Sequence, residues 1–154
     1  MRPELVTLLL AMAPVSELRL AIPYAWSQGM NHTLAYVLSV IGNIIPVVPL
    51  LLFLGPVSKF LRRFRPFDKF FSWWFSRTLR RSRLVEKYEA LGLVLFVMIP
   101  LPVTGAWTGS VVAFLLGIRF RFAFPAIILG VLLAGIIVSL GWMAIIHALL
   151  FIGH

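Results

Sequence analysis

The chain contains no cysteine and only five acidic residues among 154. Without cysteine there is no disulfide framework and no thiolate metal site. Charged residues of both signs make up 12% of the chain, against about 25% in soluble domains. Hydrophobic residues make up 61%, and the mean hydropathy is +1.01. These proportions exclude an ordinary soluble domain.

Long uncharged stretches fill most of the sequence, at residues 5–16, 20–58, 90–118 and 122–154. A run of about 18 or more apolar residues without charge is typical of a transmembrane helix. We therefore expect an all-α integral membrane protein. The net charge of +9 could indicate nucleic acid, but the apolar runs leave no room for a nucleic-acid module. We expect membrane lipids, not nucleic acid, as partners.

One pattern occurs twice, at an offset of 88 residues. The aligned pairs that mark backbone geometry are Pro14 with Pro102, Gly29 with Gly117, and Gly42 with Gly130. Because proline and glycine constrain the backbone, their placement predicts an internal repeat. We expect a single membrane domain over 1–154, with repeat 1 at about 4–55, a basic linker at about 56–89 and repeat 2 at about 90–154.

Each copy begins with two apolar arms of 10 to 12 residues separated by a proline-containing break. An 11-residue helix reaches about 16 Å, roughly half of the 30 Å hydrocarbon core. We therefore expect two re-entrant helical hairpins with tips near the midplane. The longer stretches, at about 33–53 after a cap at Asn31 and at about 123–152, can each span. One crossing per copy inverts the second repeat, as in many transporters.

Twelve of the fourteen basic residues lie in the linker or at residues 117–121. With a re-entrant second hairpin they share one face, which the positive-inside rule makes cytoplasmic, with both termini outside. We prefer this arrangement to one in which that hairpin spans. The linker alternates aromatic and basic residues, which predicts an amphipathic helix on the lipid surface or, alternatively, a partner-binding helix. The candidate contacts for anionic lipid, which could also be only a solvated loop end, are Arg77, Arg80, Arg81 and Arg83.

Glu17 and Arg19 are the ionisable residues that this arrangement places near the midplane. Ionisable groups there are costly and point to function. Glu17 suits a proton or a cation, and Arg19 suits an anion or pairing with Glu17; alternatively, both charges only hold the tip. Ser16 and Thr104 follow the breaking prolines, where we expect each to cap the returning helix. Two helix N-termini at the midplane would suit an anionic group such as a lipid phosphate.

The second tip is uncharged but dense in proline, glycine and hydroxyl residues, as a broken membrane helix requires. Trp107 and Thr108 are candidates for the wall opposite Glu17, with Trp107 either stacking on a substrate or packing. The residues expected to shape the two tips are Pro14, Pro100, Pro102, Gly105 and Gly109. The histidines lack metal-ligand spacing, and no catalytic grouping occurs, so we expect no metal, no cofactor and no enzyme.

Two motifs carry a family resemblance: PVSELRLAIP at residues 14–23 and PLPVTGAWTGS at residues 100–110, with the linking residues 86–89 and 92. They resemble the small multi-drug export family of prokaryotic membrane proteins and, more distantly, the DedA-like proteins with paired re-entrant hairpins. The resemblance covers most of the chain and implies membrane transport, with a homodimer as the assembly. The sequence departs from the family pattern at Val15 and Leu20, where small residues are expected.

Three functions remain open from the sequence. The first is a transporter, a small multidrug or small-molecule exporter, whose midplane site is built from both tips. The second is a flippase or scramblase for a phosphate-bearing lipid such as polyprenyl phosphate, because DedA-like proteins are associated with lipid translocation. The third is a non-transporting membrane scaffold. Two spans and two hairpins give a monomer little protein to shield a midplane site, so we expect a homodimer.

Overall fold

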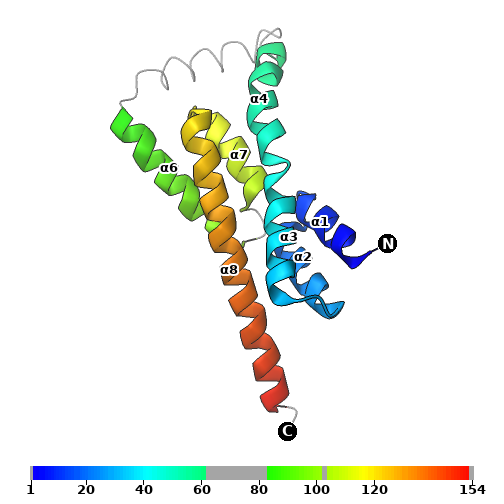
Figure 1. Ribbon diagram of the computed structural model, residues 1–154. Coiled ribbons are helices and arrows are strands. Elements are labelled where there is room, and N and C mark those ends of the chain that lie inside the picture. Colours follow the sequence, from blue (N-terminus) through cyan, green and yellow to red (C-terminus); the bar gives the residue numbers. More distant parts are fainter. Residues whose placement is uncertain (1, 62–82, 102–103, 153–154) are drawn as a thin grey trace.

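The computed structural model describes residues 2–61, 83–101 and 104–152. All regular secondary structure in these ranges is α-helix, arranged as in Figure 1, which confirms the all-α prediction. The helices are α1 Pro3–Met12, α2 Glu17–Ser27, α3 His32–Ile44, α4 Val47–Leu61, α6 Arg83–Met98, α7 Ala106–Leu115 and α8 Phe120–Ile152.

Two helical stretches are long and apolar enough to cross a membrane. They are His32–Val57, formed by α3 and most of α4, and the whole of α8. With 26 and 33 residues they reach about 39 and 50 Å, more than the roughly 30 Å of hydrocarbon. Asn31 caps α3 by accepting a hydrogen bond from the Thr33 amide at 2.9 Å, as predicted. Figure 1 shows α4 ending and α8 beginning at the same end of the molecule, so the two stretches run in opposite directions.

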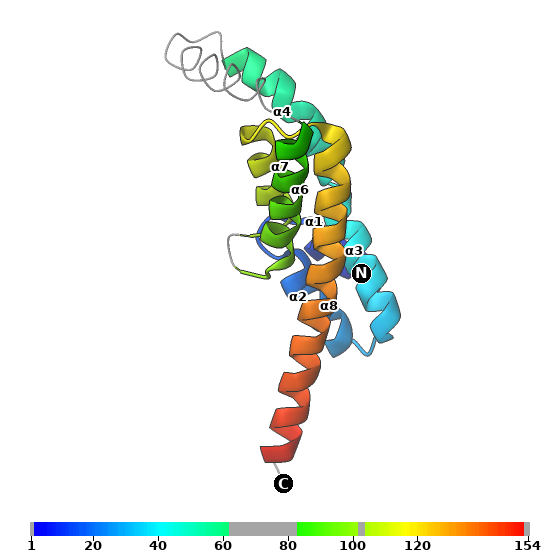
Figure 2. The same ribbon diagram turned by 90° about the vertical axis from the view of Figure 1, so that its left-hand side faces the viewer.

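The shorter helices form two groups along these stretches. Helix α1 packs against α2 and α3, whereas α6 and α7 pack against each other and against α8. Figures 1 and 2 show α6 and α7 beside the upper part of α8, and α1 and α2 lower down beside α3. The groups meet through contacts of α2 and α3 with α8, and α4 packs against α7.

The last part of the expected basic linker is helical. Helix α6 has 16 residues and begins at Arg83, so residues 83–89 form its first part. Charged residues are good helix formers and continue the helix without a break. The predicted amphipathic segment falls largely on residues 62–82, outside the described residues, and so do three of the four predicted lipid contacts, Arg77, Arg80 and Arg81.

The same backbone motif ends α2 and α7. Gly29 and Gly117 have φ angles of 73° and 66°, in the left-handed region that glycine adopts readily. The backbone hydrogen bonds around each glycine form a Schellman motif. In each bond an amide donates to a carbonyl: Gly29 to Trp26 at 2.9 Å, Met30 to Ala25 at 3.1 Å, Gly117 to Phe114 at 3.0 Å and Ile118 to Ala113 at 2.9 Å. Corresponding residues are 88 positions apart, which is the predicted offset.

Close crossings depend on glycines of the long helices. A Cβ atom at Gly42 would lie 2.6 Å from the Leu8 carbonyl oxygen of α1, and one at Gly130 would lie 2.7 Å from Val97 Cβ of α6. Neither position accepts a side chain without a shift of the neighbouring helix. Each aligned glycine therefore brings a long helix against the first short helix of its own group.

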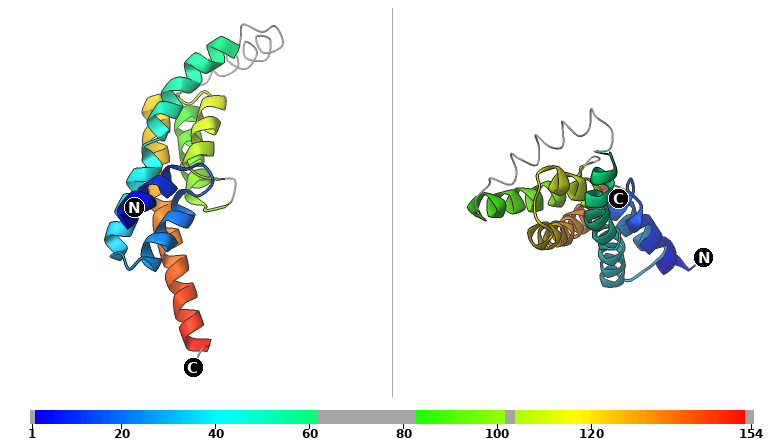
Figure 3. Two further views of the ribbon diagram at one scale, coloured as in Figure 1. Left: turned by 90° about the vertical axis from the view of Figure 1, so that its right-hand side faces the viewer. Right: turned by 90° about the horizontal axis from the view of Figure 1, so that it is seen from above.

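Apolar side chains also cover the outside of the molecule. Phe53 is 65% exposed and Phe151 is 87% exposed, and the end of α8 extends beyond the other helices in Figure 3. Continuous apolar exposure of this kind marks an interaction surface and not one that faces water. Together with the two long apolar helices, it agrees with a membrane environment.

Candidate functional site

Glu17 begins α2 in a strained and buried position. It is only 5% exposed, and its φ of 43° lies in the left-handed region, which costs a non-glycine residue roughly 1–2 kcal/mol. Its amide donates to the Ala13 carbonyl at 3.2 Å, which closes the turn between α1 and α2. Strain of this kind clusters at functional positions.

The Glu17 carboxylate caps α7, a helix that begins almost 90 residues later. The Trp107 amide donates to Oε1 at 3.4 Å, and the Ala106 amide also interacts with the carboxylate. The N-cap residue of α7 is Gly105, where a Cβ atom would lie 1.8 Å from Glu17 Oε2. Glycine thus lets the carboxylate reach amides where the helix dipole favours negative charge.

Arg19, also in the first turn of α2, contacts the same region. Its Nη2 donates to the Thr104 carbonyl at 3.1 Å, and its charge acts on Glu17 electrostatically. The Thr104 hydroxyl holds the connection before α7, where it accepts from the Leu101 amide at 3.0 Å and donates to the Ile99 carbonyl. Both charged residues of α2 therefore bind the start of α7 or the residue just before its N-cap.

Trp107 links α7 to α1, because its indole Nε1 donates to the Met12 carbonyl at 3.0 Å. Met12 is the last residue of α1, where carbonyl groups lack helical partners. The Thr108 hydroxyl donates to the carbonyl of Gly105, the N-cap residue of its own helix, at 3.4 Å. Trp107 is thus hydrogen bonded to protein, and Thr108 is turned to its own helix.

The capping prediction is right for the position of Ser16 and wrong for Thr104. Ser16 is the N-cap residue of α2, but its side chain makes no cap bond; its hydroxyl donates back to the Leu10 carbonyl. Thr104 lies one residue before the N-cap of α7 and bonds back to Ile99. The preceding helix ends carry carbonyls without helical partners, and these attract the hydroxyls. Glu17 supplies the cap of α7 instead.

The remaining predicted tip residues are distributed over several places. Pro100 and Gly105 line a small cavity next to Glu17. Pro14 is exposed between α1 and α2, and Pro102 lies outside the described residues. Gly109 packs closely against α6, because a Cβ atom there would lie 2.5 Å from the Val97 side chain. Arg83 is the first residue of α6. Of the predicted residues, the structure therefore brings Glu17, Arg19 and Thr104 together with Pro100 and Gly105. It also brings the backbone amide of Trp107 to Glu17.

A cavity of about 10 Å³ lies where these groups meet. Its polar lining comes from Glu17, Arg19, Asn43 and Thr104, and small and aliphatic residues of α6, α7 and α8 complete it. A space of this size holds about one water molecule. A drug or a lipid head group therefore enters only if the helices separate.

Asn43 is the residue of this site that sequence reasoning missed. It lies on α3, is 1% exposed, and its Oδ1 has no hydrogen-bond partner. The signal was present, because an amide inside the uncharged run 20–58 is unusual for a membrane helix. It was overlooked because an asparagine does not interrupt a run defined by the absence of charge.

A larger groove of about 380 Å³ opens between the start of α3 and the middle of α8. It is lined mainly by aromatic and aliphatic side chains, including Trp26, Tyr36 and Leu140. The Tyr36 hydroxyl donates to the Leu132 carbonyl at 2.9 Å and joins the two helices beside the groove. Its volume falls in the range of small-molecule sites, but none of the predicted site residues lines it.

Comparison with known proteins gives one match. The model of a family described as "Putative small multi-drug export protein" matches residues 17–137. The matched region begins at Glu17 and includes every residue that lines the cavity except Val138. No curated protein and no solved structure matches the chain.

Proposed function

The chain belongs to the small multi-drug export family, and from that premise we propose that it is a membrane transporter that exports small molecules, with Glu17 as its coupling site. One observation carries the proposal: the buried carboxylate of Glu17, on α2, caps α7. An ionisable side chain thus takes part in the contact between the two helix groups. A change in its charge changes the strength of that contact.

The proposal includes two inverted repeats, each with a re-entrant hairpin. Helices α1, α2 and α7 have 10, 11 and 10 residues and reach only about 15–16 Å, too little to cross the hydrocarbon core. The matching Schellman motifs at Gly29 and Gly117 and the matching close contacts at Gly42 and Gly130 support the repeat. In Figure 1, α6 and α7 lie beside the upper part of α8, and α1 and α2 lie lower down beside α3, an offset that inverted repeats would produce.

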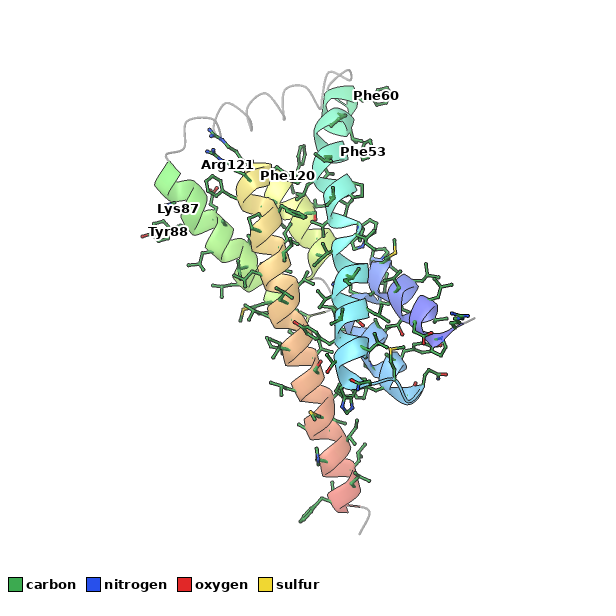
Figure 4. The ribbon with its side chains drawn as sticks, viewed as in Figure 1. Phe53, Phe60, Lys87, Tyr88, Phe120 and Arg121 are labelled. Atoms are coloured by element: carbon green, nitrogen blue, oxygen red, sulfur yellow. The ribbon has the colours of Figure 1, made fainter. Side chains whose placement is uncertain are left out.

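The proposed orientation has the basic end in the cytoplasm and both termini outside. Figure 4 places Lys87 and Arg121 at the same end of the molecule as Phe60, near the end of α4. The C-terminus lies at the opposite end in Figure 1. Basic residues on one side favour that side as cytoplasmic.

The cavity favours a proton over a phosphate as the occupant at Glu17. A phosphate at the start of α7 would need the amides that the Glu17 carboxylate occupies, and the space holds about one water molecule. A lipid-translocating role would require Glu17 to leave α7 first. The open groove of about 380 Å³ is the space that fits a drug-sized molecule in this conformation.

The test is transport by the full chain in proteoliposomes, with ethidium and a labelled polyprenyl phosphate as the two cargoes. We expect Glu17→Gln and Arg19→Ala to abolish ethidium flux, because each removes a charge at the contact between α2 and α7. Glu4→Gln, at an exposed acid on α1, is the matched control and should transport normally. Loss of lipid translocation alone would favour the flippase. Unchanged flux of both cargoes in folded variants would refute the site assignment, and no flux of either cargo through the unaltered chain would favour the scaffold.

The proposed assembly is a homodimer. Every residue from 141 to 152 on α8 is exposed in the single chain, so this apolar end offers a surface for a second copy. Because the chain has no cysteine, Leu149→Cys introduces a single thiol. We expect a disulfide-linked dimer when this variant is oxidised in lipid bilayers. If single cysteines at several positions along this face all gave only monomers, the result would contradict the dimer.

A further inference from the structure

We propose that Asn43 is the second partner of Glu17: when Glu17 carries a proton, its O–H group donates to Asn43 Oδ1, directly or through one water molecule. This inference rests on the proposed function in treating Glu17 as the proton site. It assigns to α3 a role in proton binding and makes the cavity a site for a single proton with at most one water molecule.

The first argument is the environment of Asn43. The residue is almost fully buried, and its Oδ1 lacks a hydrogen-bond partner. Native structures rarely leave a buried amide oxygen unpaired, so such an atom calls for an explanation. Asn43 lines the same water-sized cavity as Glu17. A protonated Glu17 carboxyl group can therefore reach Asn43 Oδ1 directly or through one water molecule.

The second argument counts donors and acceptors. An ionised carboxylate only accepts hydrogen bonds, and Oδ1 of an asparagine also only accepts. Arg19 donates from Nη2 to the Thr104 carbonyl, and Asn43 Oδ1 accepts from none of the N–H groups of Arg19. A proton from the aqueous phase converts the Glu17 carboxylate into a carboxylic acid, and hydronium becomes water. The new O–H group supplies the donor that Asn43 lacks.

The third argument separates a proton from a metal cation. A metal cation needs a shell of several oxygen ligands, but the Thr104 carbonyl already accepts from Arg19 and the Thr104 hydroxyl is bonded to Ile99. The positive charge of Arg19 at the cavity also repels a second cation. Among the described lining residues, Glu17 and Arg19 are the titratable ones, and the side chains from α3, α6, α7 and α8 are uncharged.

Protonation would then move Glu17 from one helix to another. In the ionised state the carboxylate accepts from the Trp107 amide of α7, and hydrogen bonds to a charged acceptor are about twice as strong as neutral ones. The neutral acid is a weaker acceptor, so α7 loses its cap while Asn43 on α3 gains a bond. Proton uptake would thus release the contact between the two helix groups.

The chain allows a direct test, because Asn31 and Asn43 are its only asparagines. Solid-state NMR of the full chain in lipid bilayers, with ¹³C-labelled asparagine, would give two side-chain amide signals. The protonation of Glu17 is measured from its carboxylic-acid C=O band in the infrared spectrum. This band is assigned to Glu17 because Glu17→Gln lacks it. We expect the Asn43 signal to shift in step with this band. Asn31, an exposed helix cap, should not shift, and the Asn43 shift should vanish in Glu17→Gln.

A matched pair of variants gives a second measurement. Asn43→Leu should move the Glu17 acid band to higher wavenumber, because its O–H group loses a partner. Ser39→Ala should leave the band unchanged; Ser39 is also buried and unpartnered on α3 but does not line the cavity. If Asn43→Leu does not fold, the NMR experiment on the unaltered chain still decides.

Two results would overturn the inference. One is an Asn43 signal that stays constant while the Glu17 band titrates. The other is the absence of any Glu17 acid band down to the lowest pH at which the protein stays folded. Coupled Asn43 and Glu17 signals without any flux of cargo would support the inference and count against the proposed transport function, so the two failures are distinguishable.

Discussion

Alanine at Gly105 tests how closely α2 and α7 are joined. The φ of Gly105 is 163°, an extended value that alanine adopts without strain, so any cost comes from the added methyl group. That Cβ atom would lie 1.8 Å from Glu17 Oε2 and 2.5 Å from Glu17 Cδ. The carboxylate must therefore leave the start of α7, or α7 must move.

Both responses to Gly105→Ala carry a similar cost. Overpacking a close contact costs about 1–3 kcal/mol, and losing a hydrogen bond to a charged group costs about 1.5–3 kcal/mol. We therefore expect the free energy of unfolding to fall by about 2–3 kcal/mol. Reversible unfolding in mixed micelles, followed by circular dichroism, measures this change.

Two comparisons make the Gly105 experiment specific. Gly92 on α6 has open space where its Cβ would be, and alanine favours a helix by about 0.8–1 kcal/mol over glycine, so Gly92→Ala should cause no loss. In a Glu17→Ala background the carboxylate is gone, and Gly105→Ala should cost less than about 1 kcal/mol, a coupling that a double-mutant cycle reports. An equal cost in both backgrounds would refute the proposed contact.

The same unfolding assay tests two further contacts. Gly29→Ala and Gly117→Ala should each cost about 1–2 kcal/mol, because both glycines have left-handed φ angles; clearly unequal costs would count against equivalent motifs. Trp107→Phe should cost about 0.5–1.5 kcal/mol through the lost bond to Met12, and no change in stability would show that the indole does not hold α1.

The long helices could be predicted because hydropathy alone determines them. The expected spans at about 33–53 and 123–152 agree with His32–Val57 and α8 to within a few residues, since an apolar run has few other stable states in a membrane. The start of α6 could not be predicted in this way. Its first residues are charged and continue the helix into the basic linker, where hydropathy gives no boundary.

The site could be predicted in part. Glu17 and Arg19 were recognisable because each is a charge beside long uncharged runs. Their partners were not, because the cap of α7 comes from a residue 90 positions earlier in the chain. Local rules assign caps to adjacent hydroxyls, and here a tertiary contact took that role from Thr104. Asn43 was missed for a different reason, since its importance lies in an unpaired oxygen and not in a charge.

The strain at Glu17 supports a functional role for the carboxylate over a structural one. Asparagine tolerates left-handed φ angles better than glutamate does, so a tip in which only the turn mattered could use it with less backbone strain. We expect Glu17→Asn to recover about 1–2 kcal/mol of strain and to lose the bond to the α7 amides, worth about 1.5–3 kcal/mol. Its free energy of unfolding should therefore fall by no more than about 2 kcal/mol, whereas its ethidium flux should be lost. Glu17→Asn that is stable and still transports would show that the carboxylate is not the coupling group.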